Sequence, residues 1–136
     1  MEYVYLSVSY VFQRTNLFLN LVEKFQNKNV KFKYFPIGKR YEPTDAQDVS
    51  NAKCILVVPP TGPDANGKVV VGKGVYGQLT ENPTVPTYFL NEPLSVVYSV
   101  KECIPNDTTD FQYAFGELIY DHDSKISLEE FLCQNI

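Results

Sequence analysis

Three short predicted strands within the first 58 residues constrain the fold most strongly. They occupy residues 3–9, 30–35 and 53–58. The first run lacks a clean alternation of polar and apolar positions, which is typical of a strand covered on both faces. Strands of this kind belong to parallel sheets flanked by helices, so the pattern predicts an α/β protein.

The segments between these runs predict helices. One stripe of a 3.6-residue helix is formed by Leu17, Phe18, Leu21, Val22 and Phe25. Thr15 or Asn16 is suited to cap the start of this helix, which we expect to end near Asn27. Residues 42–51 predict a second, short helix with Pro43 in its first turn. The order is therefore β-α-β-α-β.

The second half of the chain predicts further strands and two helices. Residues 69–71 lead into a helix that ends before Pro83, and residues 85–90 form the next strand. Residues 95–102 and 113–120 predict an antiparallel hairpin, and a short helix from about Ser127 closes the chain. The predicted fold is one Rossmann-like, three-layer α/β domain over residues 1–136, with a mostly parallel sheet and a C-terminal antiparallel hairpin.

Composition narrows the choice of partners. Of the 136 residues 44% are hydrophobic, which supports an ordinary core, and the net charge is -4. Residues 1–40 carry seven basic and two acidic side chains, whereas the remainder carries five and fourteen. No basic helix is interleaved with aromatic residues, so the pattern does not favour a nucleic-acid partner.

Cysteine usage and hydropathy indicate the compartment. The three cysteines lie far apart and form no C-x-x-C pair, which fits reduced thiols in the cytosol. No basic segment followed by an apolar one opens the chain, and no run is long enough to cross a bilayer. We expect a cytoplasmic protein without a membrane partner.

A possible calcium loop begins at Asp121, but two required positions differ. Ile126 stands where such a loop needs glycine, and Leu132 stands where it needs a bidentate glutamate. Ser127 and Glu130 instead form the pattern of a helix capping box. The sequence therefore predicts no metal site and no cofactor.

The glycine motif Gly72-x-Gly74-x-x-Gly77 is the clearest candidate site. As a string it matches the dinucleotide fingerprint, but it does not follow the first strand, and no acid follows about twenty residues later. It favours a loop that opens a helix at the carboxyl edge of a parallel sheet, where backbone N–H groups can hold a phosphate. The alternative is a connection that merely needs glycines.

The order of these features resembles that of a known family. A small-residue turn at residues 7–10 ends the first strand, Asp45 opens the segment before residues 53–58, and residues 74–79 precede the strand at 85–90. This arrangement resembles the nucleoside 2-deoxyribosyltransferase-like proteins and their Rossmannoid relatives, which bind nucleotides or ADP-ribose derivatives. The resemblance covers residues 3–91 and implies a ligand site at the strand ends.

The resemblance also implies what the site lacks. The family's chemistry uses a carboxylate nucleophile at the anomeric carbon, but Gln78 stands at the position of that glutamate and Gly72 at the position of an aspartate. Because an amide cannot form the glycosyl ester, we predict a binding protein for a nucleotide-like small molecule, without catalytic residues. The predicted ligand-binding residues are Ser9, Tyr10, Asp45, Lys73, Gly74, Tyr76 and Gln78.

Four of the predicted residues have an expected role in ligand binding. Two alternatives to a binding protein remain. Tyr10 or Tyr76 would stack on a base, Lys73 would hold a phosphate, and Gln78 would bind a ribose hydroxyl. One alternative is a nucleoside glycosyltransferase or N-glycosidase that uses Asp45 and Glu81. The other is a structural or interaction module that forms a homo-oligomer through the edge of the C-terminal hairpin.

Overall fold

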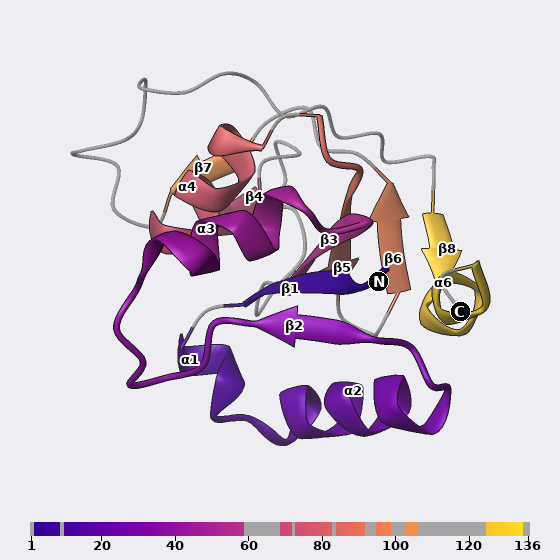
Figure 1. Ribbon diagram of the computed structural model, residues 1–136. Coiled ribbons are helices and arrows are strands. Elements are labelled where there is room, and N and C mark those ends of the chain that lie inside the picture. The colour runs from indigo at the N-terminus through magenta and orange to yellow at the C-terminus, as the bar shows by residue number, and fades with distance from the viewer. Residues whose placement is uncertain are drawn as a thin grey trace.

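The computed structural model describes residues 2–8, 10–58, 69–71, 73–82, 84–91, 95–98, 103–105 and 125–134 (Figure 1). The described helices and strands are β1 (Val4–Val8), α1 (Tyr10–Gln13), α2 (Asn16–Asn27), β2 (Phe32–Tyr34), α3 (Pro43–Ser50), β3 (Cys54–Val58), β4 (Val69–Val71), α4 (Lys73–Glu81), β5 (Thr87–Asn91), β6 (Ser95–Tyr98), β7 (Cys103–Pro105), β8 (Lys125–Ser127) and α6 (Leu128–Gln134).

The main sheet has the strand order β2-β1-β3-β5-β6-β8. Its first four strands are parallel, whereas β6 is antiparallel to β5 and β8 is antiparallel to β6. The strands β4 and β7 form a separate two-stranded parallel sheet. The α/β class and the parallel sheet are thus confirmed, and the architecture is consistent with a Rossmann-like fold.

The predicted C-terminal hairpin is described only in its first strand. β6 occupies the beginning of residues 95–102 and pairs with β5 and β8. The second predicted strand, at residues 113–120, lies outside the described residues. The closing helix is confirmed as α6, and the Glu130 N–H donates to Ser127 Oγ at 3.1 Å, as expected of a cap.

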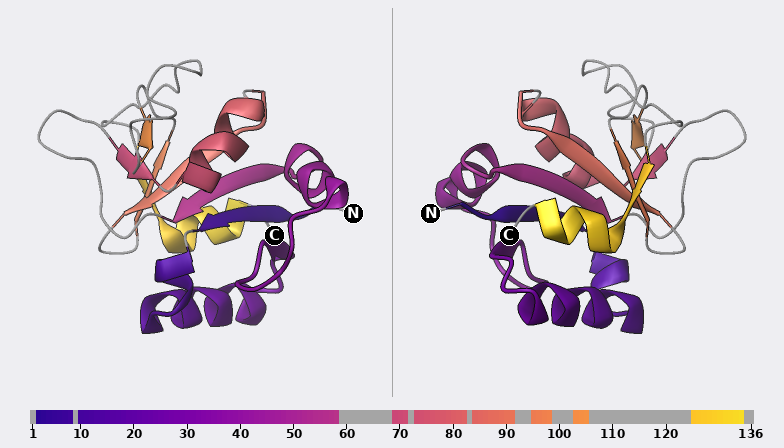
Figure 2. Two further views of the ribbon diagram at one scale, coloured as in Figure 1. Left: turned by 90° about the vertical axis from the view of Figure 1, so that its left-hand side faces the viewer. Right: turned by 90° about the vertical axis from the view of Figure 1, so that its right-hand side faces the viewer.

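β1 and β3 form the centre of the sheet. Their register runs from Val4 opposite Cys54 to Val8 opposite Val58, and every residue of both strands is buried. Helices cover both faces: α1 and α2 lie on one side, and α3 and α4 lie on the other (Figures 1 and 2). This covering explains why the first strand lacks alternation in the sequence.

Helix α2 begins and ends through specific backbone contacts. The Thr15 side chain accepts the Phe18 N–H at 3.3 Å, which confirms it as the N-cap. At the other end Asn29 adopts a left-handed φ of 58°, and the Val30 N–H donates to the Phe25 carbonyl at 3.0 Å. This is a Schellman-type ending, which turns the chain back toward β2.

The core on this side joins distant parts of the chain. The ring of Phe25 lies 5.5 Å from that of Phe32 and 6.5 Å from that of Phe131 on α6, between ring centroids. Of the predicted stripe, Leu17 is exposed, so the buried face of α2 is narrower than expected.

No described helix is both long and apolar enough to cross a membrane.

We expect Phe25→Ala to lower the free energy of unfolding by about 3–5 kcal/mol, because it would leave a cavity between α2, β2 and α6. Leu19→Ala, on the same helix at a position 59% exposed, is the matched control and should change it by less than about 0.5 kcal/mol. Urea denaturation measures both, and equal losses would contradict the described packing.

Candidate functional site

The chain reverses its direction of travel across the sheet between β1 and β3. From β1 it passes through α1 and α2 to β2 on one side, and from β3 it passes through α4 to β5 on the other. The two connections cover opposite faces of the sheet (Figure 2). In open α/β sheets the crevice outside the carboxyl ends of such a strand pair is where ligands bind.

Gln78 joins α4 to the face of β1. Ser7 Oγ donates to Gln78 Oε1 at 2.6 Å, and Gln78 Nε2 donates to Tyr5 Oη at 3.2 Å. Ser7 and Tyr5 are only 1% and 2% exposed, so this network lies beneath α4. Desolvation raises the pKa of the Tyr5 phenol far above its ordinary value of 10.0, which keeps its proton in place.

This network retains hydrogen-bonding capacity. A primary amide offers two N–H donors and two acceptor lone pairs, and Gln78 uses one of each on Tyr5 and Ser7. Among the described residues no acceptor receives the Tyr5 O–H. Sequence reasoning selected Gln78 but missed Ser7 and Tyr5, although their odd positions on a buried strand place them on one face.

Asp45 lies in the first turn of α3 and is buried. One carboxylate oxygen accepts the Glu42 N–H at 2.8 Å, and the other is bonded to the Lys39 ammonium. The Lys39 ammonium, aided by the Glu42 N–H, lowers the pKa of Asp45 below its ordinary value of 3.8. Asp45 therefore stabilises the start of α3, where an anion also complements the helix dipole.

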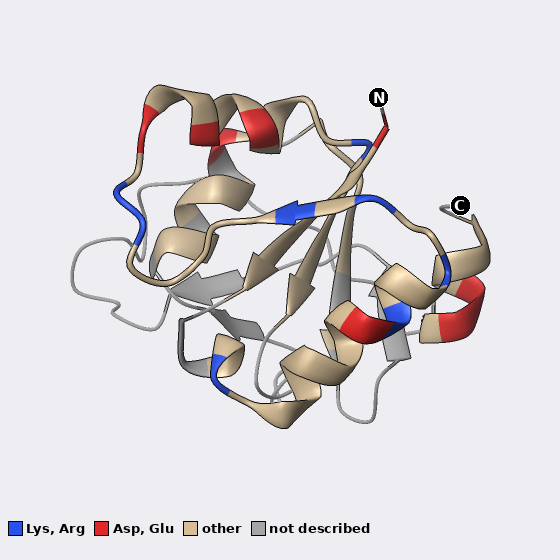
Figure 3. Ribbon diagram, turned by 60° about the horizontal axis from the view of Figure 1, so that its bottom comes forward, with Lys and Arg blue, Asp and Glu red and all other residues tan. Residues whose placement is uncertain are grey.

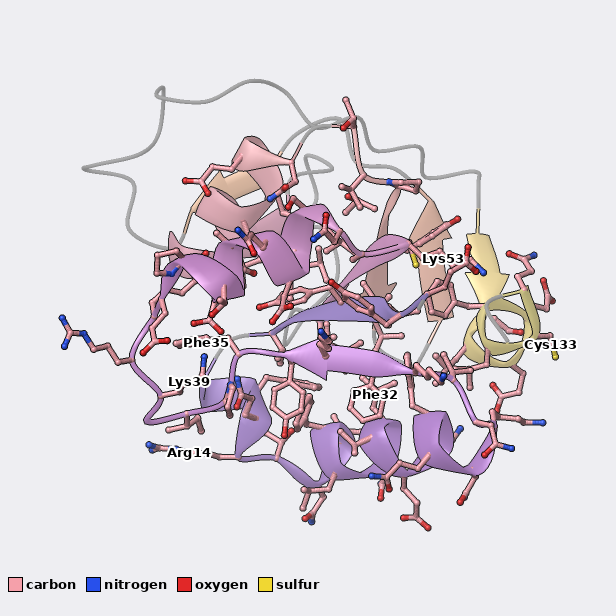
Figure 4. All side chains as sticks on the ribbon, viewed as in Figure 1. Arg14, Phe32, Phe35, Lys39, Lys53 and Cys133 are labelled. Atoms are coloured by element: carbon pink, nitrogen blue, oxygen red, sulfur yellow. The ribbon has the colours of Figure 1, made fainter. Side chains whose placement is uncertain are left out.

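The segment between β2 and α3 is held from two sides. Gln13 on α1 donates to the Phe35 carbonyl at 2.9 Å and accepts the Ile37 N–H at 3.2 Å. Lys39 lies 5.4 Å from the centroid of the Phe35 ring, and Figure 4 shows both at one corner of the molecule. Gly38 adopts a φ of +84°, which glycine accommodates without strain.

Tyr41 ends this segment beside two carboxylates. Burial raises the pKa of its phenol above 10.0, and Glu81 and then Asp45 raise it further. Asp45 and Tyr41 also act on the Tyr5 phenol. The two acids named in the enzyme alternative thus lie within electrostatic reach of one tyrosine, and sequence reasoning did not select that tyrosine.

The glycine motif does not have the predicted form. Because α4 begins at Lys73, Gly74 lies inside the first turn of the helix rather than in the loop expected before it. A Cβ atom added at Gly74 or at Gly77 would meet nothing within 4 Å, so neighbouring atoms do not impose glycine there. Tertiary context overrides the low helix propensity of glycine, which had favoured a loop.

The structure describes the predicted ligand-binding residues unevenly. Gln78 and Asp45 lie on α4 and α3, over the same face of the sheet, and Gly74 is exposed on α4. The side chains of Tyr10, Lys73 and Tyr76 lie outside the described part of the chain, as do Ser9 and Gly72 entirely. The calcium-like residues 121–124 lie outside it too.

Acidic residues are concentrated along and just before α3 (Figure 3). Two of them are neutralised by lysines, because Lys39 binds Asp45 and Lys33 Nζ lies 3.1 Å from Asp48 Oδ1. In the described ranges no three His, Cys, Asp or Glu side chains gather in a way that could hold a metal ion.

Comparisons with protein-family models, with curated proteins and with solved structures find no match to this chain. What defines the class of protein is therefore the described architecture, an α/β sheet with four neighbouring parallel strands that is consistent with a Rossmann-like fold.

We expect Gln78→Leu to lower the free energy of unfolding by about 1–3 kcal/mol, because the buried Ser7 hydroxyl would lose its acceptor. Gln78→Glu keeps an acceptor for Ser7 and should cost less. Gln47→Leu, at an exposed position of α3, is the matched control. Urea denaturation measures all three, and a Gln78→Leu variant as stable as Gln47→Leu would refute the network's role.

The contribution of Asp45 to stability should depend on pH. Because the folded-state pKa is lowered, the contribution is present above 3.8 and is lost as the pH falls through the folded value. The difference in urea midpoint between the wild type and Asp45→Asn should therefore be larger at neutral pH than at about pH 2. In a Lys39→Gln background this pH dependence should shrink; a difference that is constant with pH would contradict the assignment.

Proposed function

We propose that this chain binds a nucleotide-like small molecule at the carboxyl ends of β1 and β3 and does not transfer glycosyl groups. The observation that carries the proposal is the reversal of chain direction between these two strands, whose last paired residues are Val8 and Val58. In open α/β folds, ligands bind in the crevice outside the carboxyl ends of two strands at such a reversal.

The polar groups beside this edge suit a sugar. Gln78 keeps one N–H and one lone pair for a ligand. A ribose hydroxyl both donates and accepts, so it matches the amide on both counts. Because Ser7 and Tyr5 hold the amide in place, little side-chain entropy would be lost when a ligand binds.

A phosphate would bind at the start of α4. This helix has nine residues, and its first N–H groups and dipole favour an anion. In the proposal Lys73 supplies a positive charge, Gly74 exposes backbone N–H, and Tyr10 or Tyr76 stacks on the base. Ser9, which follows β1 in the sequence, is a further ligand-binding residue of the proposal. Asp45 is assigned an indirect role, since both of its oxygens are engaged by Glu42 and Lys39.

Two observations argue against glycosyl transfer. Gln78 carries an amide at the position that requires a carboxylate nucleophile. Asp45, whose pKa is lowered, is anionic at neutral pH and holds no proton for a departing base. The enzyme alternative keeps one supporting observation: Asp45 and Glu81 act on the same Tyr41 phenol.

Calorimetry against adenosine, AMP, ADP-ribose and a cyclic nucleotide tests the proposal. We expect saturable binding, with AMP weakened about tenfold by Lys73→Ala and adenosine unchanged, because a charge-assisted hydrogen bond to phosphate is lost. Lys28→Ala is the matched control, since Lys28 is exposed and caps the C-terminal end of α2.

Three outcomes would overturn the proposal. No heat with any ligand would remove it, and stable self-association seen by light scattering would then favour the interaction module. Release of free base from nucleosides, abolished by Asp45→Asn, would replace it with the enzyme alternative.

A further inference from the structure

The segment from Phe35 to Tyr41 presents an aromatic ring to solvent at the carboxyl edge of the sheet. It follows the last residue of β2, and β2 runs parallel to β1, so it emerges on the same edge as the proposed ligand site. Tyr41 is 50% exposed. A single exposed aromatic residue is ordinary on a protein surface, so its position and support decide whether it has a role.

Side-chain contacts hold both halves of this segment against the rest of the fold. Gln13 fixes its first half through two hydrogen bonds, and Lys39 ties its second half to Asp45 on α3. The ring of Tyr41 contacts that of Phe35 at 5.4 Å between centroids, with an interplanar angle of 55°. Part of the Tyr41 ring thus contacts Phe35, and the rest of the ring is exposed to solvent.

The position of Tyr41 connects the segment to the proposed site. Its phenol is influenced by Asp45 on α3 and Glu81 on α4, and it influences Tyr5, which is bonded to Gln78. Tyr41 precedes Glu42, the N-cap of α3, and follows Lys39, whose ammonium binds Asp45 in the first turn of that helix. A rigid aromatic side chain with two rotatable bonds provides contact area at low entropic cost.

We propose that Tyr41 is the residue on which the base of the bound nucleotide stacks, with Phe35 as its support. This inference rests on the proposed function and replaces its two unassigned tyrosines by one that the structure describes. The class of ligand it selects is one that carries a planar heteroaromatic ring. Sugar phosphates without a base would then bind the same edge more weakly.

The absence of tryptophan from the chain makes a direct test possible. Tyr41→Trp introduces a single tryptophan, whose fluorescence should be quenched saturably by AMP and by ADP-ribose but not by ribose 5-phosphate. Leu19→Trp is the matched control and should not respond, because Leu19 is 59% exposed and belongs to α2, which lies on the other side of the sheet from α3 and α4 (Figure 1). In calorimetry Tyr41→Ala should weaken AMP binding by about tenfold or more and leave ribose 5-phosphate unchanged.

The outcomes separate this inference from the function on which it rests. If the wild type binds AMP in calorimetry but Tyr41→Ala binds it equally well, the stacking role is refuted and the proposed function stands. If tryptophan at position 41 stays silent while calorimetry shows AMP bound to that same variant, the inference is again refuted. If the wild type binds none of the probes, both proposals are overturned together.

Discussion

The parallel pairing of β1 with β3 is the constraint on which the other features depend. Both strands are buried along their whole length, so each face must be covered, and the two faces receive different helices. A right-handed crossover that moves one way across a parallel sheet covers one face, and a crossover that moves the other way covers the opposite face. The chain leaves β1 toward β2 and leaves β3 toward β5, so the ends of these two strands mark the point where open α/β folds bind their ligands.

The sequence predicted the elements that depend on local chemistry. Apolar runs became β1, β2 and β3, and Thr15 and Ser127 accept backbone N–H groups at the starts of α2 and α6, as their positions indicated. The sequence analysis did not predict the short helix α1. It also did not predict the pairing of β4 with β7, because strand pairing over a long separation leaves no local pattern. The helical Gly74 shows the same limit, since propensity alone had favoured a loop.

The candidate site was predictable in outline and not in its bonding. The structure places Gln78 and Asp45 on helices over one face of the sheet. It could not reveal that Gln78 is held by Ser7 and Tyr5, or that Lys39 and Glu42 occupy both oxygens of Asp45. Such partners are fixed by side-chain geometry in the folded protein. The same reason hid the hydrogen bonds of Gln13 to the segment after β2, on which the position of Tyr41 depends.

The register of the central pair also has a consequence for how the chain assembles. Val4 faces Cys54, so the innermost contact of the sheet closes a loop of roughly 50 residues before it contributes any stability. Non-local closure of this kind slows folding relative to proteins whose contacts are local. Within that loop α2, its Schellman ending and β2 form a compact unit of short separation, which can collapse first and shorten the effective distance between the two central strands. The turn at Asn29 joins the two elements of this unit, α2 and β2, across only a few residues.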